Sequence, residues 1–194
     1  MSFDEHVYGV LVVSPPGRFL DTLFELLPAS RFSPVASVSS VSSAKRMIAE
    51  RDFDLVIINS PLPDDTGVRF ASDVCASKSS VVLITVRSEL YSETYEKSAE
   101  YGVFVLSKPT TRLMISTALD WMAGVRERLK KTEIQTHSVE SKIEEIRLVN
   151  KAKWLLIREL KMDEPTAHRY IEKLSMDRCV TKKAAAEEII KTYM

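Results

Sequence analysis

Few side chains in this chain of 194 residues have the type and spacing needed for chemistry. His6, His137 and His168 are scattered, without a carboxylate or cysteine at metal-ligand spacing. No glycine-rich phosphate loop occurs, and no Ser-His-Asp order stands out. Asn59 is the most informative residue, because it ends the run Asp54–Ile58, which is typical of a buried strand. An amide oxygen is a poor nucleophile with no ionised form near neutrality. We therefore expect no enzyme, metal site or cofactor.

The residues after Asn59 carry a family pattern. Pro63 and Gly67 follow at offsets of four and eight. This spacing resembles the segment of response-regulator receiver domains in which an aspartate accepts a phosphoryl group. The resemblance implies that Thr85 and Lys108, at the ends of the fourth and fifth strands, complete a degenerate phosphoacceptor site with Asn59. An alternative of equal weight is that Lys108 hydrogen-bonds the amide of Asn59.

The chain departs from the receiver pattern where the chemistry would occur. Receivers hold Mg²⁺ with three carboxylates, and this ion usually requires such oxygen ligands. Here Ser14-Pro15-Pro16 replaces the acidic pair, and Val105 stands where an aromatic switch residue is usual. Asp64 and Asp65 follow Pro63, on the wrong side of the loop to replace the acceptor. We therefore expect no phosphorylation, and a domain used for interaction or dimerisation instead.

Charge is distributed unevenly along the chain. The 27 Lys+Arg and 27 Asp+Glu cancel, but residues 1–120 carry 11 against 15 and residues 121–194 carry 16 against 12. The charge therefore allows an acidic partner such as nucleic acid at the second part and argues against one at the first.

Sequence motifs in the last fifty residues carry a second resemblance. They are Lys151-Ala152-Lys153-Trp154-Leu155-Leu156, Asp163-Glu164-Pro165-Thr166-Ala167, Ser175-Met176-Asp177-Arg178 and Lys182-Lys183. This series is similar to the ANTAR domain, the RNA-binding three-helix module of transcription antitermination regulators. The family's usual order, receiver then coiled coil then ANTAR domain, matches as well. Trp154 departs from the pattern, which usually has glycine there.

We expect the RNA contacts to come from cations near the helix junctions and from aromatic rings. The candidate residues are Lys153, Arg178, Lys182, Lys183, Tyr170 and Trp154. Arg178 has an alternative role in pairing with Glu172 or Asp177. Tyr170 lies on an apolar stripe, so we expect it to pack in the core, whereas Trp154 either stacks on a base or fills a gap against the next helix.

The elements that must position these residues fall into two groups. Up to about residue 110, five apolar strand-like runs alternate with helical segments, which predicts a flavodoxin-like (CheY-like) α/β fold with a five-stranded parallel sheet. The serine-rich stretch Ser37–Ser43 reads as a loop. After the sheet we expect one long helix to about Leu160 and two short helices capped by Asp163 and Thr181. We assign residues 1–120 to a receiver-like domain, 121–150 to a coiled-coil linker helix and 143–194 to the three-helix domain.

The long helix carries apolar residues with the 3-4 spacing of a coiled coil. The seam residues are Met122, Val125, Leu129, Val139, Ile143, Ile146 and Asn150. Thr132 and Thr136 weaken its middle, and an asparagine in the seam favours a parallel dimer in register. The alternative is a helix that packs only on its own domain.

Cys75 and Cys179 lack CxxC spacing and indicate reduced thiols. No membrane span is found, and Met1–Glu5 does not resemble a signal peptide, so we expect a cytoplasmic protein.

We interpret the chain as a dimeric antitermination regulator that binds hairpin loops in nascent leader RNA and prevents terminator formation. Its control would not depend on phosphorylation and would come instead from a regulatory protein at the receiver-like domain, from a ligand or from the expression level. The alternatives are a protein-interaction adaptor without RNA binding and, less favoured, a DNA-binding regulator.

Overall fold

The computed structural model describes residues 6–77 and 79–193, and of His137 and Glu140 the backbone only. By contacts between residues the chain divides into two units, Met1–Lys131 and Thr132–Met194. Met1–Glu5, which we expected not to act as a signal peptide, and the side chain of His137 lie outside the described residues.

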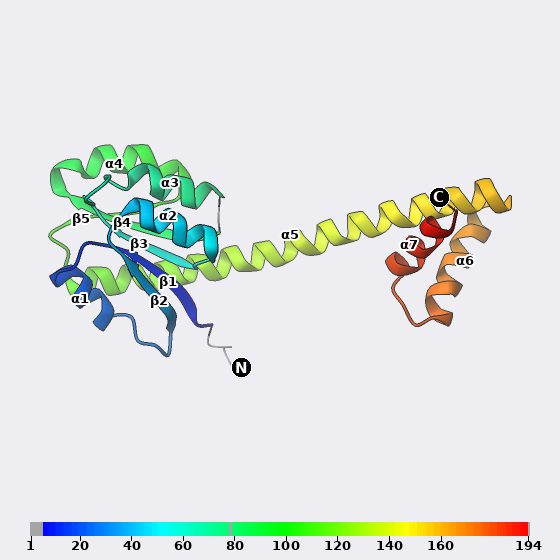
Figure 1. The fold of residues 1–194 in the computed structure, drawn as a ribbon, viewed down its shortest axis with the longest axis horizontal. Helices are drawn as coiled ribbons and strands as arrows, with labels where there is room; N and C mark the ends of the chain where they lie inside the picture. The colour runs from blue at the N-terminus through cyan, green and yellow to red at the C-terminus, as the bar shows by residue number, and fades with distance from the viewer. Residues whose placement is uncertain (1–5, 78, 194) are drawn as a thin grey trace. The chain divides into compact units, whose positions relative to one another are not determined.

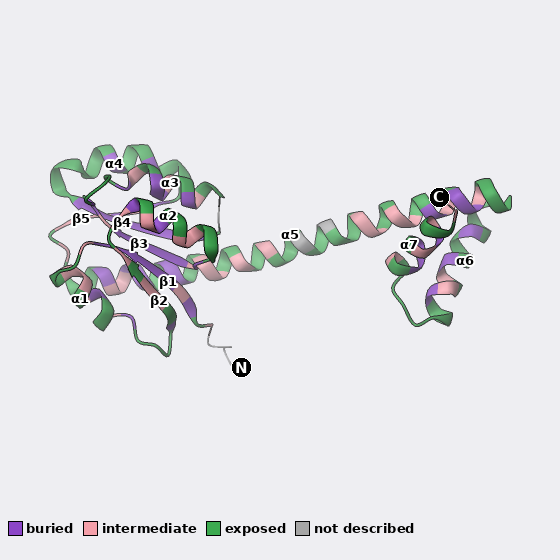
Figure 2. Ribbon diagram, viewed as in Figure 1, coloured by how far each residue is buried: buried purple, intermediate pink, exposed green. Residues whose placement is uncertain are grey.

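The first unit is built on a parallel sheet with the order β2-β1-β3-β4-β5. The strands are β1 (Tyr8–Val13), β2 (Phe32–Val38), β3 (Leu55–Asn59), β4 (Val81–Arg87) and β5 (Phe104–Lys108). This order confirms the predicted fold class. β1, β3 and β4 form the buried centre, since their runs of Val, Leu and Ile are covered on both faces (Figure 2).

Helices cover both faces of this sheet (Figure 1). They are α1 (Arg18–Glu25), α2 (Val41–Glu50), α3 (Val68–Ser77), α4 (Tyr91–Ser98) and the start of α5 (Arg112–Leu160), and short 3₁₀ turns η1 (Ser88–Leu90) and η2 (Ala99–Tyr101) flank α4. Alternate strand residues point to opposite faces. One face packs Leu11, Val56 and Ile84 with residues of α2 and α3, and the other packs Val12, Ile57 and Leu83 with α1 and α5.

An ion pair fixes α5 to the start of β3. Arg126 Nε donates to Asp54 Oδ1 at 2.8 Å, and the backbone N–H of Gly9 donates to Asp54 Oδ2 at 2.9 Å. Both charged side chains are largely buried, so losing one partner would leave the other charge poorly solvated.

Two details differ from the sequence expectations. The stretch Ser37–Ser43 is not a loop, because β2 runs to Val38 and α2 begins at Val41. Ser40 is the N-cap, and its hydroxyl accepts from the backbone N–H of Ser43 at 3.2 Å. The helix α3 was not predicted individually.

The second unit joins the end of α5 to α6 (Glu164–Asp177) and α7 (Lys182–Tyr193). Its core consists of small and branched apolar residues: Ala152, Leu156, Ala167, Ile171, Ala185, Ala186 and Ile189. Both predicted caps are confirmed, since Asp163 accepts from the N–H of Thr166 at 2.9 Å and Thr181 from that of Ala184 at 3.2 Å. The long helix ends at Leu160, as expected, and Lys161 then takes a positive φ of 55°.

None of the helices among residues 6–77 and 79–193 is long and apolar enough to cross a membrane.

Candidate functional site

The side chain of Asn59 is held in a neutral hydrogen-bond chain at the carboxyl end of β3. Thr85 Oγ1 donates to Asn59 Oδ1 at 3.2 Å, and Asn59 Nδ2 donates to Ser14 Oγ at 2.9 Å. The hydroxyl of Ser14 donates onward to the carbonyl of Pro15 at 2.9 Å. Thr85 and Ser14 are buried, where an unpaired polar group would be costly. The side-chain oxygen and nitrogen atoms of Asn59, Thr85 and Ser14 all have hydrogen-bond partners within the protein.

Lys108 completes this cluster in a different way from the sequence expectation. Its ammonium group donates to the backbone carbonyl of Ser60, which follows Asn59, rather than to the Asn59 amide. Burial, and secondarily the positive charge of Arg87, lower the pKa of Lys108. Lys108 therefore fastens the loop after β3 to β5.

The two nearby carboxylates serve the loop and not the Asn59 cluster. Asp64 accepts from the backbone N–H groups of Val41 and Ser42, both at 2.9 Å, and so caps the start of α2. These N–H groups, that of Ser42 first, lower the pKa of Asp64. Asp65 accepts from the N–H of Gly67 at 2.6 Å. In the part of the chain that the structure describes, no three His, Cys, Asp or Glu residues gather as metal ligands would.

Steric limits explain why a glycine stands at position 67, eight residues after Asn59. Its φ is +79°, and a Cβ there would lie 2.9 Å from Ile58 Cγ2. The glycine thus lets the loop pass close to the buried end of β3.

Three of the four predicted RNA-binding cations are paired with carboxylates of neighbouring helices. Lys153 Nζ lies 2.9 Å from Glu164 Oε1, and Lys182 Nζ lies 2.6 Å from Glu172 Oε1. Arg178 pairs with Glu188 of α7, not with Glu172 or Asp177. Hydrogen bonding by Lys182, and then its charge, lowers the pKa of Glu172.

Lys183 is half-buried, and the structure gives it no ion pair among residues 6–77 and 79–193. It follows Lys182 at the start of α7. Lys183 is therefore the predicted cation least engaged within the unit itself.

Both aromatic candidates stand at the surface. Trp154 is 71 % exposed, so it fills no gap against α6. Tyr170 is 40 % exposed and lies outside the core, and this corrects the expectation that it packs inside. The core position is taken by Ile171 next to it.

The predicted seam residues divide into two groups. Met122 is fully buried against the sheet of the first unit, which corrects its assignment to the seam. Val125 and Leu129 are each 37 % exposed, and Ile143 and Ile146 are each 60 % exposed. Val139 and Asn150 are exposed as well. Large apolar side chains thus remain open on α5 within each unit.

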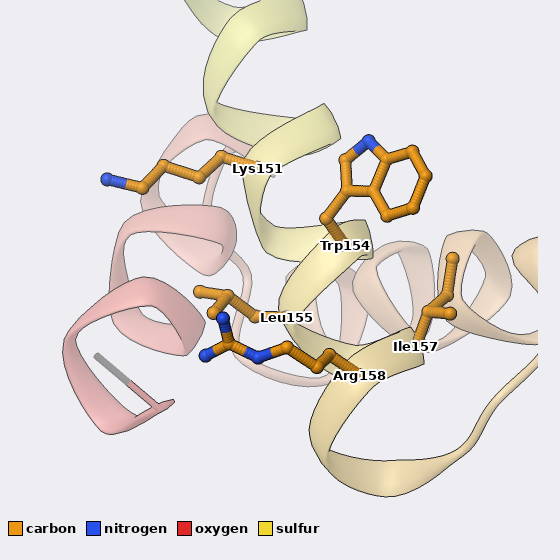
Figure 3. Close-up of a pocket in the computed structure, with 5 residues that line it drawn as sticks. All are labelled: Lys151, Trp154, Leu155, Ile157 and Arg158. Carbon is orange, nitrogen blue, oxygen red and sulfur yellow. The ribbon is translucent and has the colours of Figure 1, made fainter.

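The sequence did not predict a cavity on α5 beside Trp154. This cavity, called the Trp154 pocket below, has a volume of about 610 Å³ and is lined by Lys151, Trp154, Leu155, Ile157 and Arg158. Figure 3 shows the indole projecting away from the helix, uncovered by the other four side chains. The signal available in the sequence was a tryptophan with cations three residues before it and four after it, which places them on one face of a helix.

Comparison with known proteins agrees with both units. Residues 137–190 match the model of the ANTAR domain. "Transcriptional regulatory protein PdtaR" of Mycobacterium tuberculosis is 24 % identical over 185 residues, covering 94 % of this chain and 89 % of that protein.

Solved receiver structures resemble the first unit in fold. The signal receiver domain of an HD domain-containing protein from Pseudomonas fluorescens Pf-5 has a TM-score of 0.58 at 20 % identity, covering 68 % of this chain and 96 % of that one. A response regulator receiver domain from Clostridium thermocellum has a TM-score of 0.55 at 20 % identity, covering 65 % and 99 %. Residues 137–190 therefore form an ANTAR domain, and the unit ahead of them has a CheY-like receiver fold.

Proposed function

We propose that this protein is an RNA-binding antitermination regulator that acts as a dimer on hairpin loops of nascent leader RNA and prevents terminator formation. The observation that carries the proposal is the three-helix unit matching the ANTAR domain, with Lys182, Lys183 and Arg178 at the junction of α6 and α7. Cations supply the phosphate contacts of such an interface, and exposed rings supply stacking. No catalytic step is part of this function.

Dimerisation would raise the affinity of two weak loop-binding units. The exposed apolar side chains of Val139, Ile143 and Ile146 on α5 support a second copy as their partner. Linking two modules makes the second binding event intramolecular, which increases avidity without any new contact.

We further propose that control is independent of phosphorylation. The neutral chain through Thr85, Asn59 and Ser14 supports this, because it offers neither an acceptor carboxylate nor carboxylate ligands for Mg²⁺. A regulatory protein at the receiver-fold unit would then bias the dimer or its RNA affinity.

The proposal is tested by reversing the charge of Lys182 and Lys183 together (Lys182→Glu with Lys183→Glu). RNA affinity should fall, and the slope of log affinity against log salt should flatten by about 0.7 for each lost phosphate contact. The matched control reverses Lys45 and Arg46 on α2, which changes the net charge equally and should leave RNA binding unchanged.

A protein-interaction adaptor is the second candidate. The pairing of Lys153, Arg178 and Lys182 with Glu164, Glu188 and Glu172 favours it, since paired cations attract phosphate less strongly. If the adaptor role is correct, neither double reversal changes RNA binding more than the other.

A further inference from the structure

The Trp154 pocket combines an aromatic face, an apolar floor and a basic rim. Leu155 is buried beneath it, while Trp154 is 71 % exposed. Lys151 and Arg158 supply the polar part of the lining (Figure 3). The volume of about 610 Å³ lies within the roughly 300–1,000 Å³ of small-ligand sites.

The rim cations are available to a phosphate group. Lys151 is exposed and, within the described part of the chain, has no ion pair. Arg158 Nε donates to Glu159 Oε1 at 2.6 Å, but both side chains are well exposed. Exposed pairs of this kind are weak, so a phosphate can replace the carboxylate at little cost.

A second copy of the chain is the competing occupant, and the heptad spacing argues against it. The predicted seam passes through Ile146 and Asn150, and its next position is residue 153. Lys153 stands there, mostly buried, with its ammonium group 2.9 Å from Glu164 of α6. At Lys153 the row of seam residues faces α6 of the same chain. Trp154 is not part of that row, so it does not occupy a position that would face a partner helix.

We propose that the Trp154 pocket receives one unpaired base of a bound RNA loop. The base stacks on the indole, and Lys151 and Arg158 hold the phosphates on either side. Every base has a π face, so the pocket selects unpaired over paired nucleotides more than it selects one base. This inference rests on the proposed function and adds to it a defined subsite on α5.

The test uses Trp154 itself as the reporter. Trp121→Phe leaves Trp154 as the remaining tryptophan, since the chain has two. Short single-stranded RNA oligonucleotides of each base composition should quench its fluorescence, and duplex RNA of equal length should not. Labelled RNA read by anisotropy gives the affinity independently of the indole.

Substitutions in the full chain separate stacking from simple apolar contact. Trp154→Ala should weaken single-stranded RNA binding roughly five- to a hundredfold, the loss expected for one stacked base. Trp154→Phe should keep most of the affinity, and Trp154→Leu should lose it although it remains apolar. Lys151→Gln and Arg158→Gln should each flatten the salt dependence. Trp121→Ala is the matched control, because Trp121 is an exposed tryptophan in the first unit.

Three other outcomes would overturn the inference, and they can be told apart. If RNA binds with unchanged affinity to Trp154→Ala and the fluorescence stays constant, the pocket is not used while the proposed function stands. If Trp154→Ala changes the dimer dissociation constant and not RNA affinity, a second copy occupies the pocket. If the parent protein binds no RNA, the proposed function falls as well. Circular dichroism establishes that each variant is folded.

Discussion

The side-chain amide of Asn59 donates a hydrogen bond to Ser14 Oγ at 2.9 Å, at the carboxyl ends of β3 and β1. With Thr85 donating to the amide oxygen, both ends of the Asn59 side chain are occupied. The cluster therefore serves as a structural tie between β1, β3 and β4.

This tie predicts the effect of removing the amide. Asn59→Ala should destabilise the first unit by roughly 1–3 kcal/mol, because the buried hydroxyls of Thr85 and Ser14 lose a partner. Asn59→Asp should cost less, since its carboxylate can still accept from Thr85 and can also accept from Ser14 if that hydroxyl turns away from the Pro15 carbonyl. Denaturant unfolding measures both, and incubation with acetyl phosphate and Mg²⁺ should label neither the parent protein nor Asn59→Asp. Stoichiometric phosphate on the parent would contradict the proposal that control is independent of phosphorylation.

The end of α6 predicts a stabilising glycine. Cys179 has a φ of 53°, its N–H donates to Met176 at 3.1 Å, and that of Val180 donates to Ser175 at 3.0 Å. This is the Schellman pattern, whose left-handed residue is usually glycine. Cys179→Gly should raise the stability of the second unit by roughly 0.5–1 kcal/mol, the relief of strain less the entropy of glycine in the unfolded chain. The stability of the second unit is measured by thermal unfolding, with Trp154 fluorescence as the signal in the Trp121→Phe background. An equal gain in stability from Cys179→Ala would show that backbone strain is not the cause.

The two thiols should differ sharply in reactivity. Burial raises the pKa of Cys75 to about 11, whereas Cys179 is exposed. At pH 8 roughly one Cys75 thiol in a thousand is ionised, so iodoacetamide should modify Cys179 and spare Cys75. The raised pKa means that the fold favours the protonated Cys75 thiol. The resulting contribution to the free energy of unfolding is complete below about pH 9 and is lost as the pH rises towards 11. Mass spectrometry of the native and the urea-unfolded protein checks the pattern, and rapid native labelling of Cys75 would contradict its burial.

The pairing of Lys182 with Glu172 predicts that a carboxylate restrains RNA binding. Glu172→Gln frees Lys182 and should tighten RNA binding by up to roughly fivefold, with a steeper salt dependence. Since the pKa of Glu172 is lowered, the pair persists at neutral pH and is lost as pH falls through that value, where parent and variant should converge. Glu187→Gln on α7 is the control, because it removes the same charge without releasing Lys182. If it tightened RNA binding equally, the change in net charge would explain the effect and the Lys182–Glu172 pair would not.

The sequence predicted elements better than contacts. The strands were found because Leu55–Ile58 and similar runs are continuous and β-branched, and the caps because Asp163 and Thr181 precede apolar spacing. The α3 helix has a usable signal in the helical spacing of Val68, Ala71 and Val74.

What escaped prediction depends on packing between elements. A repeat of seven marks buried and open helix faces alike, so Met122 could not be separated from Ile143 by spacing. The partners of Lys182 and Arg178 lie ten residues away on another helix, and the carbonyl that Lys108 meets belongs to a loop. Such contacts are set by how the elements are placed, which local sequence does not encode.

Binding of the full chain to a leader RNA with two adjacent hairpins tests the central claim most directly. The comparison uses the same RNA with scrambled loops, one hairpin alone and duplex DNA, each at two salt concentrations, with stoichiometry from sedimentation. We expect loop-dependent binding of two chains to the paired hairpins, tighter than to one hairpin and with a specific component that survives the higher salt. Equal, weak and salt-sensitive binding to all four nucleic acids would contradict it and leave the adaptor role.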